Sequence, residues 1–215
     1  MLAILFALMA AATDTPPPPP ATPVPTATAP GFSRPASIGA PHSCPETQYP
    51  VSALQTGTEG QTIMKFTITS DGHVTDISVR TSSGNADLDA AATTCARDWL
   101  YRPALQDGAP VAMSWMAEVR WRIGVEEPYS ALASAAKSCL RADSVGWDEM
   151  KTAPFRPVAR VHFANGAMTD VTVVGSSGDS DLDSRTLACY RGLPPELMAN
   201  IPDGDQLLVI MKPNE

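Results

Sequence analysis

DGHVTDISVRTSSGNADLD, at residues 71–89, recurs at a constant offset of 94 as NGAMTDVTVVGSSGDSDLD, at residues 165–183. The repetition extends beyond these stretches, because Cys95 corresponds to Cys189 at the same offset and Cys44 to Cys139 at an offset of 95. Self-similarity at a fixed period indicates that one structural unit is present twice. The sequence therefore predicts a duplication, with modules at residues 42–125 and 126–215.

Each copy has the pattern of a strand, a turn, a second strand, a helix and a last strand. In the first copy Met64, Phe66 and Ile68 alternate with polar residues, as in a half-buried strand. Asp71-Gly72 predicts a tight hairpin turn, because glycine readily adopts positive φ. In the next strand Val74 is out of phase with Ile77, and the second copy keeps this slip, which predicts a retained β-bulge.

A helix and a last strand complete the first copy. Apolar residues recur at helical spacing up to Pro103, and they predict one buried helical face: Leu88, Ala91, Ala92, Cys95 and Trp99. From Val111 to Ile123 apolar and polar residues alternate, which predicts one strand. The predicted fold is α+β, with two tandem β-β-α-β modules that each hold an antiparallel three-stranded sheet.

The second copy departs from the first. Its helix carries Arg185 on the apolar face and ends at Gly192–Pro195. An extra helix over Ser130–Leu140 precedes its first strand, and the apolar run Leu207–Met211 predicts a more covered last strand. We interpret it as a degenerate copy.

Composition restricts the partners. The chain has 44% hydrophobic residues, enough for a core, and a net charge of −8. Nucleic acid and anionic membrane surfaces attract positively charged proteins, so this charge argues against both. The sequence does not indicate an oligomeric state.

The N-terminal segments predict export. Residues 1–12 include an uncharged apolar run, Leu2–Ala12, which has the length of a signal peptide and ends in small residues suited to cleavage. A longer apolar run upstream of Met1 would make it an inner-membrane anchor instead. Residues 13–41 are proline-rich, with Pro16–Pro20 in a row, and predict an extended linker without a packed structure.

Four cysteines in an exported chain predict two disulfides, for which three connectivities exist. Because the duplication makes Cys44 and Cys95 equivalent to Cys139 and Cys189, we expect one bridge within each copy. Four reduced thiols would be expected only if the chain stayed in the cytosol.

Other candidate sites are weaker. Asp179, Asp181 and Asp183 resemble the start of a calcium loop, but Ser184 and Tyr190 replace its glycine and its last glutamate, so helix capping explains them better. The pattern around His42 lacks the ligands of a zinc site. No nucleophile, acid and base occur in a catalytic pattern. We therefore predict a binding protein rather than an enzyme, with no metal or cofactor.

The first copy resembles the TonB C-terminal domain family. The resemblance rests on Tyr49-Pro50, Asp71-Gly72, Ser82-Ser83-Gly84, Leu88-Asp89 and Trp99-x-Tyr101-x-Pro103-Ala104, which keep the family's order and spacing. The apolar N-terminus with its proline-rich spacer is also similar to TonB, although the family's spacer alternates lysine and glutamate with proline and this one has no lysine.

The resemblance implies a periplasmic protein that binds an outer-membrane transporter or another envelope protein, and that transduces energy for transport. In the family an edge strand accepts an extended segment of the partner. The matching residues here are Val111, Met113, Ser114, Trp115, Met116, Ala117 and Val119. The alternative is an envelope structural or interaction module that uses the fold without energy coupling.

Overall fold

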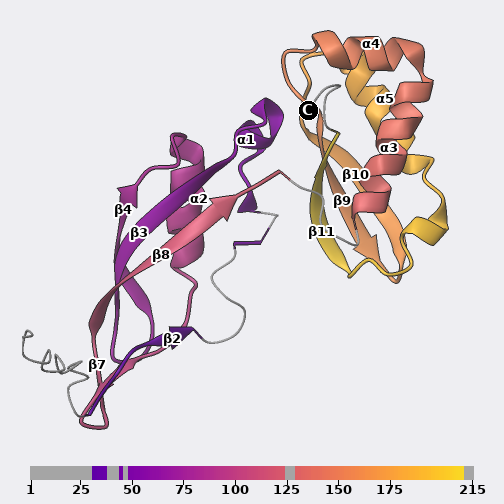
Figure 1. The fold of residues 1–215 in the computed structure, drawn as a ribbon. Coiled ribbons are helices and arrows are strands. Elements are labelled where there is room, and N and C mark those ends of the chain that lie inside the picture. The colour runs from indigo at the N-terminus through magenta and orange to yellow at the C-terminus, as the bar shows by residue number, and fades with distance from the viewer. Residues whose placement is uncertain (1–30, 38–43, 46–47, 124–128, 211–215) are drawn as a thin grey trace, which may run out of the picture. The chain divides into compact units, whose positions relative to one another are not determined.

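The computed structural model describes residues 31–37, 44–45, 48–123 and 129–210. The signal or anchor segment and most of the proline-rich linker lie outside this range. In the first module β4 (Val74–Thr81), β3 (Gly60–Ile68) and β8 (Met113–Trp121) form an antiparallel sheet in that order. The helix α2 (Ala86–Ala96) packs on one face of this sheet, and the short helix α1 (Val51–Thr56) precedes it (Figure 1).

The second module repeats this order. Its sheet consists of β10 (Ala167–Gly175), β9 (Val158–Ala164) and β11 (Gly204–Val209). The helix α5 (Ser180–Arg191) takes the place of α2, and α3 (Ser130–Ala142) and α4 (Ser144–Thr152) are added before the sheet (Figure 1). A short 3-10 helix, η2 (Pro195–Leu197), follows α5. The predicted α+β class with two three-stranded antiparallel sheets is confirmed.

The first module also contains short strands beside its main sheet. A hairpin of β6 (Ala104–Gln106) and β7 (Ala109–Val111) pairs with β1 (Phe32–Ser33). The strand β2 (Ala36–Ser37) pairs with β5 (Tyr101–Arg102). These pairings place the chain that precedes the module beside the segment between α2 and β8.

Both hairpins and both bulges follow the sequence pattern. Gly72 has φ +91°, and a Cβ there would lie 2.1 Å from the carbonyl oxygen of Tyr101, so only glycine fits. Lys65 pairs with Ser78 but Thr67 pairs with Thr75, so β4 contains one extra residue at this point. The second module has the corresponding register shift between Met168 and Asp170. The retained bulge is therefore confirmed.

A helix-entry motif occurs in both modules. The side chains of Asn85 and Asp179 accept hydrogen bonds from the N–H groups of the first helical turn, which confirms the helix capping expected at Asp179. The carboxylate of Asp89 accepts hydrogen bonds from the hydroxyl groups of Ser82 and Thr62 and from the N–H of Ser83. Asp183 accepts the equivalent bonds from Ser176 and Ser177. Each aspartate thus ties the end of a strand to the start of the following helix.

Two predictions about the first module were wrong. Trp99 does not lie on the helical face, because α2 ends at Ala96, and its ring is half-buried with its centroid 6.0 Å from that of Phe66. The fully buried aromatic residue is Tyr101. The last strand is not continuous from Val111 to Ile123 either. Val111 ends β7 and pairs with β6, whereas pairing with β3 begins at Met113 in β8.

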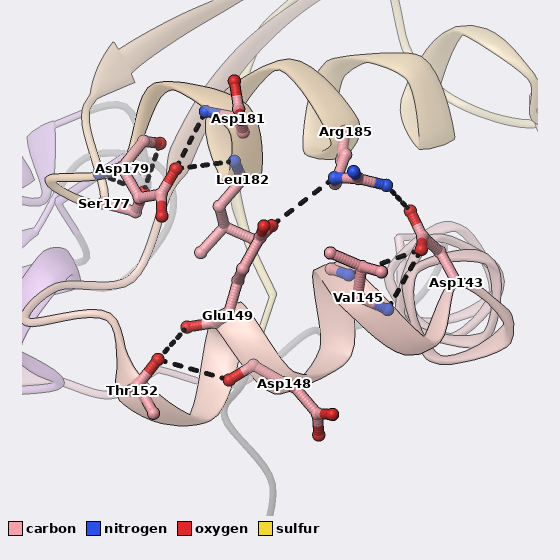
Figure 2. Close-up of polar contacts among 11 residues, drawn as sticks. Asp143, Val145, Asp148, Glu149, Thr152, Ser177, Asp179, Asp181, Leu182 and Arg185 are labelled. Atoms are coloured by element: carbon pink, nitrogen blue, oxygen red, sulfur yellow. Dashed lines mark hydrogen bonds and ion pairs between the residues drawn. The ribbon is translucent and has the colours of Figure 1, made fainter.

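The second module accommodates Arg185 by means of α4. Its guanidinium forms ion pairs with Asp143, which caps the start of α4, and with Glu149, which lies within α4 (Figure 2). The sequence placed this cation on an apolar helical face, and the added helix supplies its partners. Asp143 also caps α4 by accepting hydrogen bonds from Val145 and Gly146.

The structure contains both predicted disulfides, Cys44–Cys95 and Cys139–Cys189. The two modules are also in contact through α1. Arg156, which is 5% exposed, donates a hydrogen bond from its guanidinium to the carbonyl of Leu54, and the side chain of Gln55 donates one to the carbonyl of Ser176. Helix α1 was not predicted, because six residues are too few to show helical periodicity.

The two aromatic residues after α2 should differ in their effect on stability. Tyr101→Ala should lower the free energy of unfolding by about 3–5 kcal/mol, because it empties a fully buried site. Trp99→Ala should cost less, since its ring is already partly exposed. Urea unfolding of the two variants measures the difference, and an equal loss would contradict this assignment of the core.

Asp89→Ala should destabilise the first module by about 1–3 kcal/mol at neutral pH, because the buried Thr62 hydroxyl loses its acceptor. Partial burial disfavours ionisation of Asp89, but the hydrogen bonds from Ser82, Ser83 and Thr62 outweigh it and hold the pKa below its usual value. The stabilisation is thus present above about pH 4 and is lost as the pH falls through the folded-state pKa. Urea unfolding at several pH values should show parent and variant converging in acid.

Candidate partner-binding edge

The strand β8 lies at an edge of the first sheet. One side pairs with β3 along its whole length, from Ile68 opposite Met113 to Gly60 opposite Trp121. Its other side has no strand partner among the residues that the structure describes. Such an edge presents N–H and C=O groups that can pair with another extended chain.

Exposure along β8 divides the strand into two halves. Met113, Trp115 and Ala117 are half-buried, whereas Ser114 and Met116 are exposed, with Met116 at 62%. Val119 and Trp121 are buried. The accessible half of the edge therefore runs from Met113 to Glu118.

The predicted site residues divide between two sheets. Met113, Ser114, Trp115, Met116, Ala117 and Val119 all lie in β8. Val111 lies in β7 and pairs with Ala104, so it belongs to the small hairpin and not to this edge. The alternation of apolar and polar residues continues from β7 into β8. For this reason the sequence did not reveal that the two strands pair with different partners.

The buried end of β8 is held by residues that precede the sheet. The ring of Tyr49 meets that of Trp121 edge-on, with 5.3 Å between their centroids. The Tyr49 hydroxyl donates a hydrogen bond to the carbonyl of Thr58, and the N–H of Ile123 donates one to the carboxylate of Glu59. Burial, followed by the nearby Glu59 carboxylate, raises the pKa of Tyr49 to about 12, against a smaller opposing effect of Arg156.

A shallow groove of about 690 Å³ adjoins the accessible half of β8. It is lined by Met113–Met116 together with three cations, Arg34, Lys65 and Arg80. Sequence reasoning did not identify these cations. The sequence could have indicated Lys65, because it is a single charged residue at an outward-facing position of the strand that became β3.

Other candidate chemistry has structural explanations. Asp179 and Asp183 are used in the helix-entry motif, and within the described ranges no three His, Cys, Asp or Glu residues are grouped so as to hold a metal ion. His73 lies beside the hairpin turn, and the Nδ1 of His162 lies 2.7 Å from a carboxylate oxygen of Asp205. His42 lies outside the described residues. Among the helices described, none has the length and apolar character needed to cross a membrane.

Comparison with known proteins identifies the first module. The family model described as the C-terminal of the Gram-negative bacterial TonB protein matches residues 45–123. TonB proteins from two strains of Xanthomonas campestris pv. campestris are 37% identical to the chain over 65 residues, which are 30% of this chain. The chain matches only 29% of the length of these relatives.

Two solved structures are also similar. The TonB C-terminal domain of Pseudomonas aeruginosa shares 25% identity at a TM-score of 0.34, over 44% of this chain and 92% of that domain. The corresponding domain of Helicobacter pylori shares 25% identity at a TM-score of 0.28, over 36% and 70%.

The fold defines the first module as a small α+β domain in which β8 is an edge strand of the sheet. Residues 45–123 form a domain of the TonB C-terminal family, on the evidence of the family match and of the curated relatives. The matched range ends before the second module begins.

Tyr49→Phe should lower the free energy of unfolding by about 0.5–1.5 kcal/mol, because the hydrogen bond to Thr58 is lost while the ring contact with Trp121 remains. The raised pKa favours the protonated folded form, so the contribution of Tyr49 is complete below about pH 10 and declines as the pH rises toward 12. Denaturant unfolding between neutral pH and pH 11 should show a smaller alkaline loss for the variant than for the parent. An identical alkaline loss would contradict the assignment to Tyr49.

Proposed function

We propose that this chain is a periplasmic TonB-type protein whose first module binds an extended segment of an outer-membrane transporter or another envelope protein. The observation that carries the proposal is the unpaired edge of β8 from Met113 to Glu118, within a domain of the TonB C-terminal family. A partner segment would add to the sheet as a fourth strand, with main-chain hydrogen bonds to β8.

The side chains of β8 support this role. Half-buried Trp115 and Ala117 offer apolar contact on the α2 side, and exposed Met116 offers it on the other side. An added strand alternates its side chains between the two faces of a sheet, so it would meet both. The role is binding rather than catalysis, and it requires no metal or cofactor.

Energy transduction is the stronger form of the proposal. It requires an anchored N-terminus, so that force can pass through the linker at residues 13–41 to the module. Without an anchor, the same edge would serve an envelope interaction module that is not coupled to energy. Fractionation of cells that express the full-length gene separates the two: a protein that stays in the inner membrane supports transduction, and one released with the periplasm supports the uncoupled module.

We further propose residues 42–125 and 126–215 as the two domains, the second being a degenerate TonB-like domain. Its sheet order and its helix-entry motif, in which Asp183 corresponds to Asp89, match those of the first. Two disulfides within the modules suit the oxidising periplasm.

A proline scan of β8 tests the binding edge. Successive N–H groups of an edge strand point alternately toward the neighbouring strand and outward, and proline removes the N–H. Ser114→Pro and Met116→Pro form one set, and Trp115→Pro and Ala117→Pro form the other. One set should abolish binding of envelope proteins in a pull-down while the circular dichroism spectrum stays native, and the other should unfold the module.

The spectrum is the control, because only folded variants report on binding. If every folded variant captures the same envelope proteins as the parent does, the edge of β8 is not the binding site.

A further inference from the structure

The face of the first sheet opposite α2 has a defined row of side chains. Lys65 stands at its centre on β3, paired with Ser78 of β4 on one side and with Met116 of β8 on the other. All three residues are exposed. Met116, the last residue of this row, lies on β8, where the proposed partner strand would pair.

The groove along this face is positively charged. Arg34 and Arg80 line it together with Lys65, and no carboxylate is among its lining residues. None of the three cations forms an ion pair with another residue in the part of the chain that the structure describes. Although the chain has a net charge of −8, these three cations give the groove a local positive potential, which attracts anions.

The second module provides an internal comparison. Arg160 lies at the position equivalent to Lys65, opposite Leu207 where the first module has Met116. Next to it His162 is paired with Asp205, so the open face of the second sheet carries its own carboxylate. The equivalent pair in the first module is Thr67 and Ser114, which are uncharged. Glu118, the next carboxylate along this face of β8, is ion-paired with Arg120 and not with a cation of the groove. Among the residues that the structure describes, the cations without an ion-pair partner beside Met116 are thus a property of the first module.

We propose that the open face of the first sheet selects partner segments that carry acidic side chains at alternate positions. The inference rests on the proposed addition of a strand to β8. Neighbouring strands lie about 4.8 Å apart, so an added strand would lie roughly 10 Å from β3. A glutamate on the open face of that strand and the long side chain of Lys65 can meet above Met116, and the apolar alternate residues of the segment face Trp115.

An acidic peptide fits these observations better than an anionic membrane does. Recognition of anionic lipid headgroups typically uses about 4–8 clustered lysines and arginines, more than the three in this groove. The rest of the chain is acidic and would be repelled by such a surface. An extended peptide also uses the unpaired main chain of β8, which a membrane does not.

The test uses the full chain and fluorescein-labelled peptides of about eight residues, the usual strand length or slightly more, at low salt. In the peptides valine alternates with glutamate, threonine or lysine, so that only the charge of one face changes. Fluorescence anisotropy measures binding to the parent, to Lys65→Glu, to Lys65→Glu/Arg80→Glu and to Arg160→Glu. The last variant is the matched control, because it makes the same charge reversal on the second module.

The glutamate peptide should bind the parent about tenfold more tightly than the threonine peptide, as a few exposed charge pairs allow, and the lysine peptide should bind least. Lys65→Glu/Arg80→Glu should reverse this order and Lys65→Glu should weaken it, whereas Arg160→Glu should preserve it. Circular dichroism confirms that each variant is folded.

Each other outcome is decisive. If the three peptides bind the parent equally, or if Arg160→Glu acts as strongly as Lys65→Glu, the charge preference is wrong while strand addition stands. If no peptide binds, both the preference and the proposed edge fail. Vesicles containing phosphatidylglycerol serve as the second probe: charge-dependent binding to them, without binding of the glutamate peptide, would show that the face recognises lipid and would overturn the proposal.

Discussion

The carboxylate of the fourth residue of the main helix, Asp89 in α2 and Asp183 in α5, is the constraint on which both modules depend. Asp89 receives hydrogen bonds from the end of β4 and from Thr62 of β3, and Asp183 repeats this role after β10. A charged acceptor forms stronger hydrogen bonds than a neutral one, and here it stands at a helix N-terminus, which also favours negative charge. It holds the start of the helix against the end of the preceding strand.

The two modules share this hydrogen-bonded junction of strand and helix but differ in the elements around it. The first module ends α2 early, and the following segment forms the β6–β7 hairpin before β8. The second module adds α3 and α4, and these supply ion-pair partners for Arg185 (Figure 2). Its sheet also compensates its own charge through His162 and Asp205. The groove beside β8 therefore keeps cations that have no ion-pair partner among the described residues, and the second module contributes the contact of Arg156 with α1.

The proposed recognition at β8 would divide affinity and selectivity between different groups. Main-chain pairing at an edge strand accepts many sequences, because every residue except proline offers the same N–H and C=O groups. Selectivity must then come from side chains on the two faces of the added strand. In the proposed complex, Met116 and Trp115 would provide the apolar part of that selection, and the cations around Lys65 the electrostatic part.

The sequence by itself determined the internal repeat, the strand–turn–strand–helix–strand order, the bulges, the disulfides and the helix caps. Each of these depends on neighbouring residues or on the comparison of two copies, and both are visible in a linear chain. Only the tertiary structure decided that Tyr101 rather than Trp99 fills the core, that β7 and β8 belong to different sheets, and that Arg34 and Arg80 join Lys65. The physical reason is that burial, strand partners and charge clusters are set by contacts between distant segments, which periodicity does not encode.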